Sequence, residues 1–500
     1  MRVKYSAVLT ALLTCSSLAA AQPAGRRPPS RPRPEDPFRF ELMGPAGGGR
    51  FSAITGVPGD PRVWYIGAAT GGIWKSSDSG ATFRPVFDSM PVQAIGALAV
   101  APSSPNIVWA GTGEAWAIRD ADVMGDGVYV STDSGTTWKN AGLRETGRIG
   151  RIIVHPANPN IVFVCALGRV TGPQQERGVY RTTDGGKTWQ RVLFVDANTG
   201  CSGLTIDAKR PSILFAGMWQ VEMHTWAMFS GGPGSGIYVS RDDGTTWTKV
   251  QHPGLPRSPL GKIDVAVAPS DSRRVYALIQ TADQGSLWRS DDGGASWRDV
   301  NWTRALIGRA GYYIRLAVSP SNADEILIAN SSFFRSTDGG VRFQNQPWGG
   351  DNHDIWFDPK DPRRIIDSND GGVDLSVNGG ETWQAPPLPI AQFYHIRVDD
   401  SLPYRVMGTM QDQGTASGPS NSLSSAGITL SDWHTVGGGE TGFAVPDPRD
   451  PNIVYAGEYG GFLSRYDHRS RQAIVLVVPE RACTHTMSMS HHVGVGQATQ

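Results

Sequence analysis

The sequence has little charge and no excess of either sign. Charged residues make up 18% of its 500 residues, and 46 basic side chains balance 46 acidic ones. A protein that binds nucleic acid would show a basic excess gathered in patches. The balance therefore excludes nucleic acid as the expected partner, and the low charge content argues against a coiled coil or a helix bundle.

Long apolar runs are missing once the N-terminus is passed. Arg2 and Lys4 precede an apolar segment, Tyr5 to Leu18, which is followed by a run of alanines. This pattern predicts a signal peptide over residues 1–21 and a secreted or periplasmic protein. No later segment reaches the roughly 18 apolar residues of a membrane helix, so no transmembrane span is expected. The Pro- and Arg-rich residues 22–44 are predicted to be a linker.

Cysteine is scarce. The chain has 4 cysteines, of which Cys165, Cys201 and Cys483 follow the predicted signal peptide. In an oxidising compartment Cys165 and Cys201 could form a disulfide, because the repeats described next place them on neighbouring strands. Two buried thiols are an equally good interpretation.

Glycine and tryptophan are abundant, with 61 and 16 residues, which is typical of many short strands joined by tight turns. The pattern Ser/Thr-x-Asp-x-Gly-x-x-Trp/Phe occurs six times, and a seventh copy at Ser376–Trp383 has Asn378 in place of Asp. The aspartates of the six copies are Asp78, Asp133, Asp184, Asp242, Asp292 and Asp338. Their near-regular spacing of roughly 50 residues indicates a repeat protein.

Each copy lies in a larger pattern of four short strands. In the third repeat these are expected over residues 149–156, 160–167, 178–182 and 188–193. Four antiparallel strands in every repeat predict an all-β fold, a β-propeller of four-stranded blades. The pattern continues through about nine blades over residues 45–470, and the tail 471–500 is predicted to be irregular or truncated.

The aspartates of the motif have a structural explanation. Their oxygens, and those of the Ser or Thr, can accept hydrogen bonds from turn amides, while Gly supplies a positive φ and the aromatic ring pins the turn. A calcium site is not expected, because no Glu follows at the twelfth position of the loop. We therefore predict that these aspartates hold turns, and that the chain carries no metal and no cofactor.

The repeats are identified as Asp-box (BNR) repeats, and their arrangement resembles the sortilin N-terminal domain family. It is also similar to the propellers of xyloglucanase-type glycoside hydrolases. The first resemblance implies one wide propeller near ten blades that binds peptides. The second implies a seven-blade propeller followed by part of a second, with an activity on polysaccharides. Both arrangements are compatible with nine blades.

Unusual residues gather in the loops that follow the second strand of a blade or connect one blade to the next. Strand order places these loops on the face opposite to the Asp boxes, and such loops carry function on a rigid scaffold. Aromatic planes beside carboxylates and amides suit a glycan or a peptide ligand. The ligand-binding candidates are Trp116, Arg119, Trp219, Trp226, Asp351, His353, Asp354 and Gln411.

His353 stands between two carboxylates. It could act as a general base or bind a divalent metal, but no second His lies at ligand spacing. The favoured hypothesis is a structural hydrogen-bonded pair with Asp354 or Asp351.

Catalysis is left open by the sequence. Xyloglucanase-like propellers carry a catalytic Asp two residues before a Gly-Gly pair, and the matching positions here hold Ala69 and Glu458. One of two expected carboxylates is thus missing. Two hypotheses follow: a sortilin-like module that binds a glycan or peptide, or a glycoside hydrolase with a different pair of carboxylates. The candidates for such a pair are Glu114, Asp370, Asp412, Glu440 and Glu458.

Overall fold

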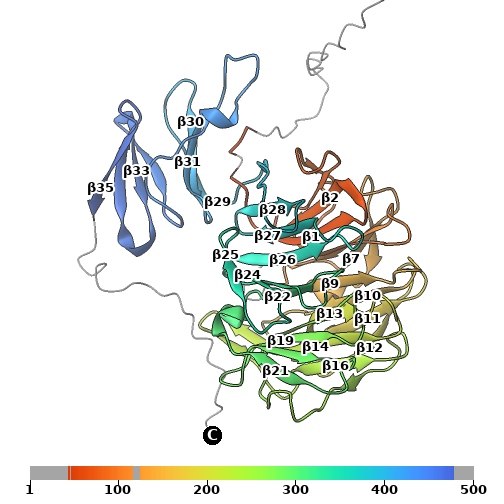
Figure 1. Ribbon diagram of the computed structural model, residues 1–500. Coiled ribbons are helices and arrows are strands. Elements are labelled where there is room, and N and C mark those ends of the chain that lie inside the picture. Colours follow the sequence, from red (N-terminus) through yellow and green to blue (C-terminus); the bar gives the residue numbers. More distant parts are fainter. Residues whose placement is uncertain (1–42, 46, 116–123, 478–500) are drawn as a thin grey trace, which may run out of the picture. The chain divides into compact units, whose positions relative to one another are not determined.

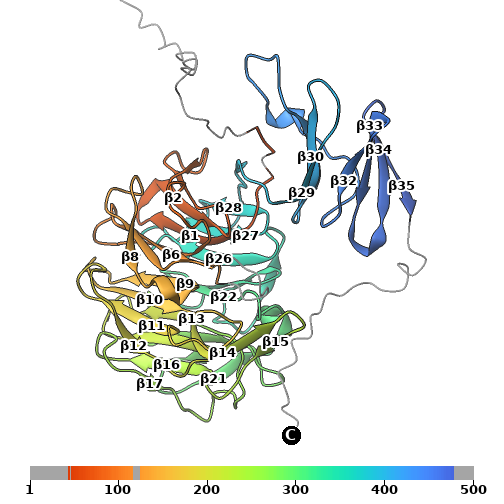
Figure 2. The ribbon, with the colours of Figure 1, turned by 180° about the vertical axis from the view of Figure 1, so that it is seen from behind.

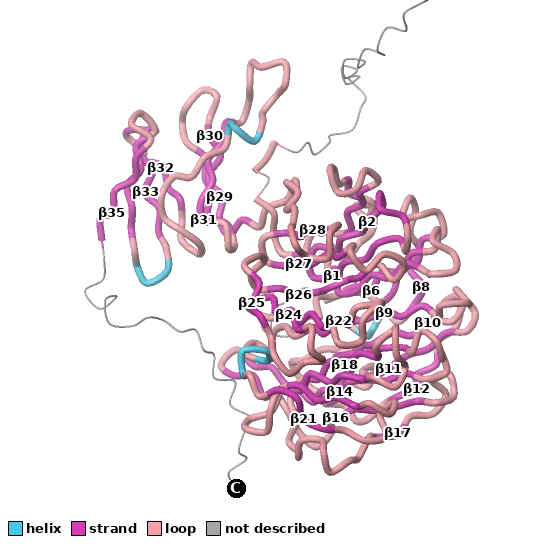
Figure 3. The backbone as a smooth tube through the Cα atoms, in the orientation of Figure 1, coloured by secondary structure: helices cyan, strands magenta, loops and turns pink. Residues whose placement is uncertain are grey.

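The computed structural model describes residues 43–45, 47–115 and 124–477. Its regular structure is almost entirely β-strand, arranged in nine small antiparallel sheets, and the helices are single 3-10 turns (Figure 3). The predicted signal peptide, 1–21, and most of the predicted linker lie outside the described residues. No helix among the described residues is long and apolar enough to cross a membrane.

The first four sheets follow the predicted repeats. Sheet one comprises β1 (Phe51–Val57), β2 (Asp60–Ala68), β3 (Ile73–Ser76) and β4 (Arg84–Pro85). Sheet two comprises β5 (Ile95–Val100), β6 (Val108–Thr112), β7 (Val128–Ser131) and β8 (Lys139–Gly142). Sheet three comprises β9 (Ile149–Val154), β10 (Val162–Ala166), β11 (Gly178–Thr182) and β12 (Gln190–Leu193). Sheet four comprises β13 (Thr199–Ile206), β14 (Leu214–His224), β16 (Gly236–Ser240), β17 (Thr248–Lys249) and the additional β15 (Ala227–Ser230).

Three more sheets complete the seven copies of the motif. Sheet five comprises β18 (Ile263–Val267), β19 (Val275–Ile279), β20 (Leu287–Ser290) and β21 (Arg298–Asn301). Sheet six comprises β22 (Arg315–Val318), β23 (Ile326–Ala329), β24 (Phe333–Ser336) and β25 (Gln344–Gln346). Sheet seven comprises β26 (Asn352–Phe357), β27 (Ile365–Asn369) and β28 (Gly372–Ser376). The 3-10 turns η1 (Arg144–Thr146) and η2 (Arg304–Ile307) connect sheets two to three and five to six.

The core is divided among the interfaces between successive sheets. Second strands such as β6 and β10 are buried along their whole length, whereas fourth strands such as β8 and β12 are only partly buried. Apolar side chains of neighbouring sheets interlock to form these interfaces, as Tyr65, Leu98 and Tyr129 do between sheets one and two. This layered burial is how a propeller keeps its blades together.

The seventh sheet packs directly against the first. Trp64 of β2 meets Trp356 of β26 edge to face at 5.6 Å, within an apolar cluster that also holds Phe51 and Ile366. β1 and β2 lie beside β26 and β27 (Figure 1). Of the two arrangements compatible with the sequence, the structure therefore has a ring that closes after seven blades.

The Asp-box turns use every oxygen of the repeated side chains. In the second repeat Asp133 accepts hydrogen bonds from Ser131 Oγ at 2.8 Å, Thr137 N at 2.8 Å and Thr137 Oγ1 at 2.7 Å. Ser131 Oγ in turn accepts from the amide of Gly135 at 2.7 Å. Hydrogen bonds from Thr137 and Ser131 lower the pKa of Asp133 to about 2. The other boxes repeat these bonds, with Asn378 taking the place of Asp in the seventh.

A disulfide joins two neighbouring blades. Cys165 of β10 and Cys201 of β13 are bonded, with their Cα atoms 5.1 Å apart. Of the two interpretations that the sequence allowed, the structure therefore has the disulfide. The cross-link ties the second strand of the third blade to the first strand of the fourth.

Two further sheets follow the ring along the chain. Sheet eight comprises β29 (Phe393–Val398), β30 (Arg405–Met410) and β31 (Gly414–Pro419), and is followed by η3 (Leu430–Asp432). Sheet nine comprises β32 (Ala444–Asp447), β33 (Asp450–Gly457), β34 (Leu463–Asp467) and β35 (Gln472–Val477), with η4 (Tyr459–Gly461) between β33 and β34. β35 corrects the prediction of an irregular tail for residues 472–477, because they pair with β34; the rest of that predicted tail, 478–500, lies outside the described residues.

Candidate functional site

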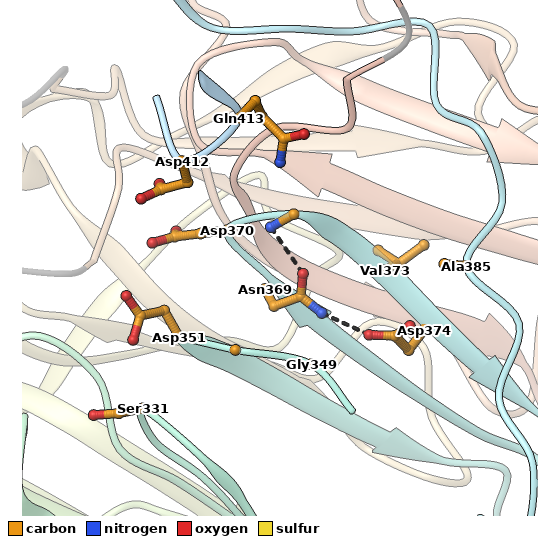
Figure 4. Close-up of a pocket in the computed structure, with 12 residues that line it drawn as sticks. Ser331, Gly349, Asp351, Asn369, Asp370, Val373, Asp374, Ala385, Asp412 and Gln413 are labelled. Carbon is orange, nitrogen blue, oxygen red and sulfur yellow. Dashed lines mark hydrogen bonds between the residues drawn. The ribbon is translucent and has the colours of Figure 1, made fainter. Parts of the chain in front are cut away.

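A pocket opens where β27 ends. Its volume is about 480 Å³, and glycines at 349, 350 and 371 keep part of its wall free of side chains. Val373 and Ala385 also line the pocket, and the other lining side chains are polar: Ser331, Asp351, Asn369, Asp370, Asp374, Asp412 and Gln413. Figure 4 shows the carboxylates of Asp351, Asp370 and Asp412 on one side of the pocket and Asn369 with Asp374 on the other.

Asp370 follows the last residue of β27 and is paired with His353 of β26. His353 Nε2 lies 3.1 Å from Asp370 Oδ1, and His353 Nδ1 lies 2.6 Å from the carbonyl oxygen of Phe51. A carbonyl can only accept, so Nδ1 carries a hydrogen. A proton must then also lie between Nε2 and Oδ1, because two acceptors would repel. A hydrogen bond between Nε2 and Oδ1 therefore joins the two side chains.

Asp370 is therefore kept ionised. Burial works to raise its pKa, but the positive charges of His353, Arg50 and Arg309 outweigh burial and hold the pKa below its usual value. The hypothesis that His353 pairs with Asp354 or Asp351 is wrong about the partner. Asp351 pairs with Arg309 at 2.5 Å, and Asp354 pairs with Arg151 at 2.7 Å.

Three residues behind this pair, Arg50, Tyr312 and Tyr313, were missed by the sequence analysis. The rings of Tyr312 and Tyr313 lie 5.8 Å and 5.3 Å from the His353 ring. Arg50 donates to the Tyr312 hydroxyl at 2.7 Å and pairs with Glu114 at 2.7 Å. The tyrosine pair between the fifth and sixth blades is the one sequence feature that could have drawn attention to them, since aromatic faces stabilise a neighbouring cation.

Asp412 lies in the β30–β31 turn. Its charged neighbours are negative, whereas those of Asp370 are positive. Burial, together with the negative charges of Asp370 and Glu440, raises its pKa to about 6. Its backbone is left-handed, with φ 58°, and Asp351 shares this feature with φ 52°. A non-glycine residue in this region is uncommon outside turns and functional sites.

Glu440 holds the turn that carries Asp412. Its Oε2 accepts from the amide of Asp412 at 3.0 Å, and its Oε1 accepts from Gln411 Nε2 at 2.9 Å and from the Tyr459 hydroxyl at 2.6 Å. Gln411 Nε2 also donates to Asp412 Oδ2 at 2.9 Å. Gln411 and Glu440 therefore fix Asp412 from two sides.

The remaining candidates lie elsewhere. Glu114 is buried against Arg50, and burial raises its pKa, so it is a support behind the pocket and not part of its wall. Trp219 is completely buried and offers no ring face to a ligand. Glu458 is exposed after β33 and is not among the residues that line the pocket. Trp226 is exposed on the β14–β15 hairpin, while Trp116 and Arg119 lie outside the described residues.

The pocket thus brings together two carboxyl groups whose pKa values are displaced in opposite directions. A protonated Asp412 can donate a proton, while an ionised Asp370 can accept one or act as a nucleophile. Such separation of two carboxylate pKa values is the arrangement that acid–base catalysis requires. In the described part of the chain, no group of three or more His, Cys, Asp or Glu side chains is arranged to hold a metal ion.

Comparison with known proteins identifies the repeats. Residues 180–191 match the BNR/Asp-box repeat family. The chain is 24% identical over 423 residues to the xyloglucanase Xgh74A of Acetivibrio thermocellus, covering 76% of this chain and 47% of that protein. It is 28% identical over 222 residues to a xyloglucanase of Hypocrea jecorina, covering 39% of this chain and 24% of that protein. The chain spans at most about half the length of these relatives.

Among solved structures, PorZ of Porphyromonas gingivalis matches with a TM-score of 0.52 and 11% identity, covering 87% of this chain and 52% of that one. PorZ is described as a bacterial surface component of the type-IX secretion system. At this identity the likeness concerns the fold alone. These comparisons support the resemblance to xyloglucanases and not the resemblance to sortilin N-terminal domains.

Proposed function

We propose that this protein is a glycoside hydrolase that acts on a polysaccharide, with Asp412 as the general acid and Asp370 as the second carboxylate. The observation that carries the proposal is the opposite displacement of their pKa values within one pocket. Glycoside hydrolysis needs one protonated and one ionised carboxyl group on either side of the scissile bond. The distant similarity to xyloglucanases supports this substrate class.

The proposed acids are not those of the xyloglucanase pattern. Ala69, at the position of the first expected aspartate, is buried and donates its amide to the carbonyl of Arg50 at 2.9 Å. The chemistry is therefore assigned to the residues at the end of β27 and in the β30–β31 turn. Asp412 would protonate the departing glycosidic oxygen, and Asp370 would attack the anomeric carbon or activate a water molecule. The anomeric configuration of the first product distinguishes the two mechanisms: attack by Asp370 gives retention, and activation of water gives inversion.

We also infer that the protein works outside the cytoplasm. The Cys165–Cys201 disulfide supports this location, because disulfides persist in oxidising compartments. The signal-peptide pattern of residues 1–21 points the same way.

The test is release of reducing ends from a panel of plant and bacterial polysaccharides, xyloglucan included. Asp412→Asn should lower kcat/KM by about 10²–10⁴-fold, the usual contribution of a general acid. Glu458→Gln is the matched control, because this exposed carboxylate lies outside the pocket lining, and it should leave kcat/KM unchanged. Binding without cleavage of any polysaccharide, or full activity of Asp412→Asn, would contradict the proposal and favour the binding-module alternative.

A further inference from the structure

Blade four carries an additional hairpin, which no other blade shows within residues 47–115 and 124–477. β14 runs for 11 residues, and its last four pair with β15 in a ribbon that lies beyond the four-stranded path of the blade (Figure 2). The amide of Met223 donates to the carbonyl of Val170 at 2.7 Å, which ties the ribbon to blade three. The hairpin is therefore an ordered, anchored projection.

The two faces of the hairpin differ sharply. Val221 and Met223 point inward and pack with Leu167, Val170 and Trp219 in a buried cluster. The alternate positions point outward, as the two-residue period of a strand requires. They carry Glu222, His224 and Phe229, with Trp226 in the turn. Trp226 is 78% exposed and Phe229 is 50% exposed, which is costly for aromatic side chains unless a partner covers them.

The exposed rings are held in place. His224 stacks on Trp226 with ring centroids 4.8 Å apart and planes 13° apart, and it meets Phe229 edge to face at 5.7 Å. Glu222 Oε1 lies 3.0 Å from His224 Nε2 and fixes the imidazole. One face of Trp226 is thus occupied by His224, and the other is open. An open aromatic face bordered by a carboxylate and an imidazole fits a sugar ring, which stacks on one side and offers hydroxyl groups at its edge.

The hairpin and the pocket share a face of the ring. The Asp-box turn of blade four bonds to the start of β14, through Asp243 N and Ser212 O at 3.1 Å. The corresponding turn of blade seven bonds to the start of β27, through Gly379 N and Arg363 O at 2.8 Å. The far ends of both second strands therefore lie opposite the Asp boxes. The end of β14 continues into the hairpin, and the end of β27 is followed by Asp370.

We propose that Trp226, with Phe229, His224 and Glu222, forms a second glycan-binding site, separate from the pocket, that retains a polysaccharide on the pocket face. The choice of a glycan as ligand rests on the proposed function. The site binds a sugar unit of the polymer that is not being cleaved. This second site therefore affects how strongly a long polysaccharide is retained, and it leaves cleavage of a short substrate at the pocket unchanged.

The experiment is native affinity electrophoresis in gels that contain soluble xyloglucan or another β-glucan, with the intact protein. Trp226→Ala should weaken retention about tenfold, the effect of a moderate hot spot. Cleavage of a short aryl glycoside, which reaches the pocket alone, should not change. The matched control is Trp302→Ala, because Trp302 is also exposed, at 57%, but is held by Asp299 at 2.6 Å instead of by a stacked ring.

The outcomes separate the two proposals. Retention that is weakened by Trp226→Ala and unaffected by Trp302→Ala supports the second site, even if no polysaccharide is cleaved. Equal retention of wild type and Trp226→Ala overturns it. Retention in gels that contain peptides in place of glycans also overturns it, since the hairpin would then bind a peptide. A lower sedimentation coefficient of the Trp226→Ala protein overturns it as well, since the hairpin would then bind a second copy of the chain.

Discussion

Asp133 and Asp412 are both aspartates in turns between antiparallel strands, yet their surroundings oppose each other. Asp133 accepts three hydrogen bonds from Ser131 and Thr137, and its pKa falls to about 2. Partial desolvation, together with the charges of Asp370 and Glu440, raises the pKa of Asp412 to about 6. The charge of Asp133 is stabilised by hydrogen bonds within its own turn, whereas the raised pKa of Asp412 makes its carboxyl group easier to protonate. In a repeat protein, departures from the repeat are therefore where chemistry should be sought.

The pH dependence of activity should show this difference most strongly. Asp412 must be protonated to act as an acid, so kcat/KM should fall about tenfold per unit as pH rises above about 6. Asp370 has a lowered pKa and stays ionised on the acidic side, which places the other limit below pH 3.8. A pH–rate profile from 3 to 9 measures both limits.

The Asp boxes should not contribute to this profile. Their pKa values are lowered, so the stability that they supply is complete above pH 3.8 and is lost only as pH falls toward 2. The melting temperature should therefore show no loss from the boxes between pH 6 and 8, where activity declines. A profile that stays flat to pH 8 would contradict the assignment of Asp412.

Replacing His353 tests whether this residue lowers the pKa of Asp370. His353→Gln should raise the pKa of Asp370, because His353 contributes most to lowering it. We expect the acid limit of kcat/KM to move to higher pH, so that kcat/KM at pH 4 falls further below its value at pH 6 than it does in the wild type. His395→Gln is the control, since His395 stacks on Phe443 and has no contact with the pair described here. An unchanged acid limit in a folded His353→Gln protein would show that His353 does not hold Asp370 ionised.

The smallest effect is expected at an Asp box. Asp133→Asn should change the melting temperature by no more than about 2 °C, the range of a neutral surface substitution. The seventh repeat already makes this replacement: Asn378 Oδ1 accepts from Thr382 N at 3.0 Å, and its Nδ2 donates to Thr382 Oγ1 at 2.9 Å. A calorimetric scan measures the shift. A large loss of activity without loss of fold would mean that Asp133 has a role beyond its turn.

The sequence predicts the blades well because each strand and turn follows local rules. The four strands predicted in the third repeat coincide with β9 to β12 within two residues at each end. The closure of the ring is not local. It depends on contacts such as Trp64 with Trp356, which are almost 300 residues apart, and no spacing rule predicts them.

The sequence predicts which residues are candidates for the site, but not which of them lie together in space. Asp370, Asp412 and Glu440 stood out because they interrupt the repeat, yet their meeting depends on how the eighth sheet follows the ring. The partner of His353 was mistaken because the irregular register of β26 at His353, and the arginines that pair with Asp351 and Asp354, depend on contacts between distant parts of the chain. Trp219 was expected in a loop, but β14 extends past the blade and buries it.

The pocket takes Asp370 from the closed ring and Asp412 from a sheet that lies outside it. The proposed activity consequently depends on a sheet that the closed ring does not include. The seven blades can complete their mutual contacts, their Asp boxes and their disulfide without any residue of β29–β31. A spectroscopic signal from the seven blades then reports that the ring is folded. Asp370 and Asp412 come together only when the eighth sheet is also in place.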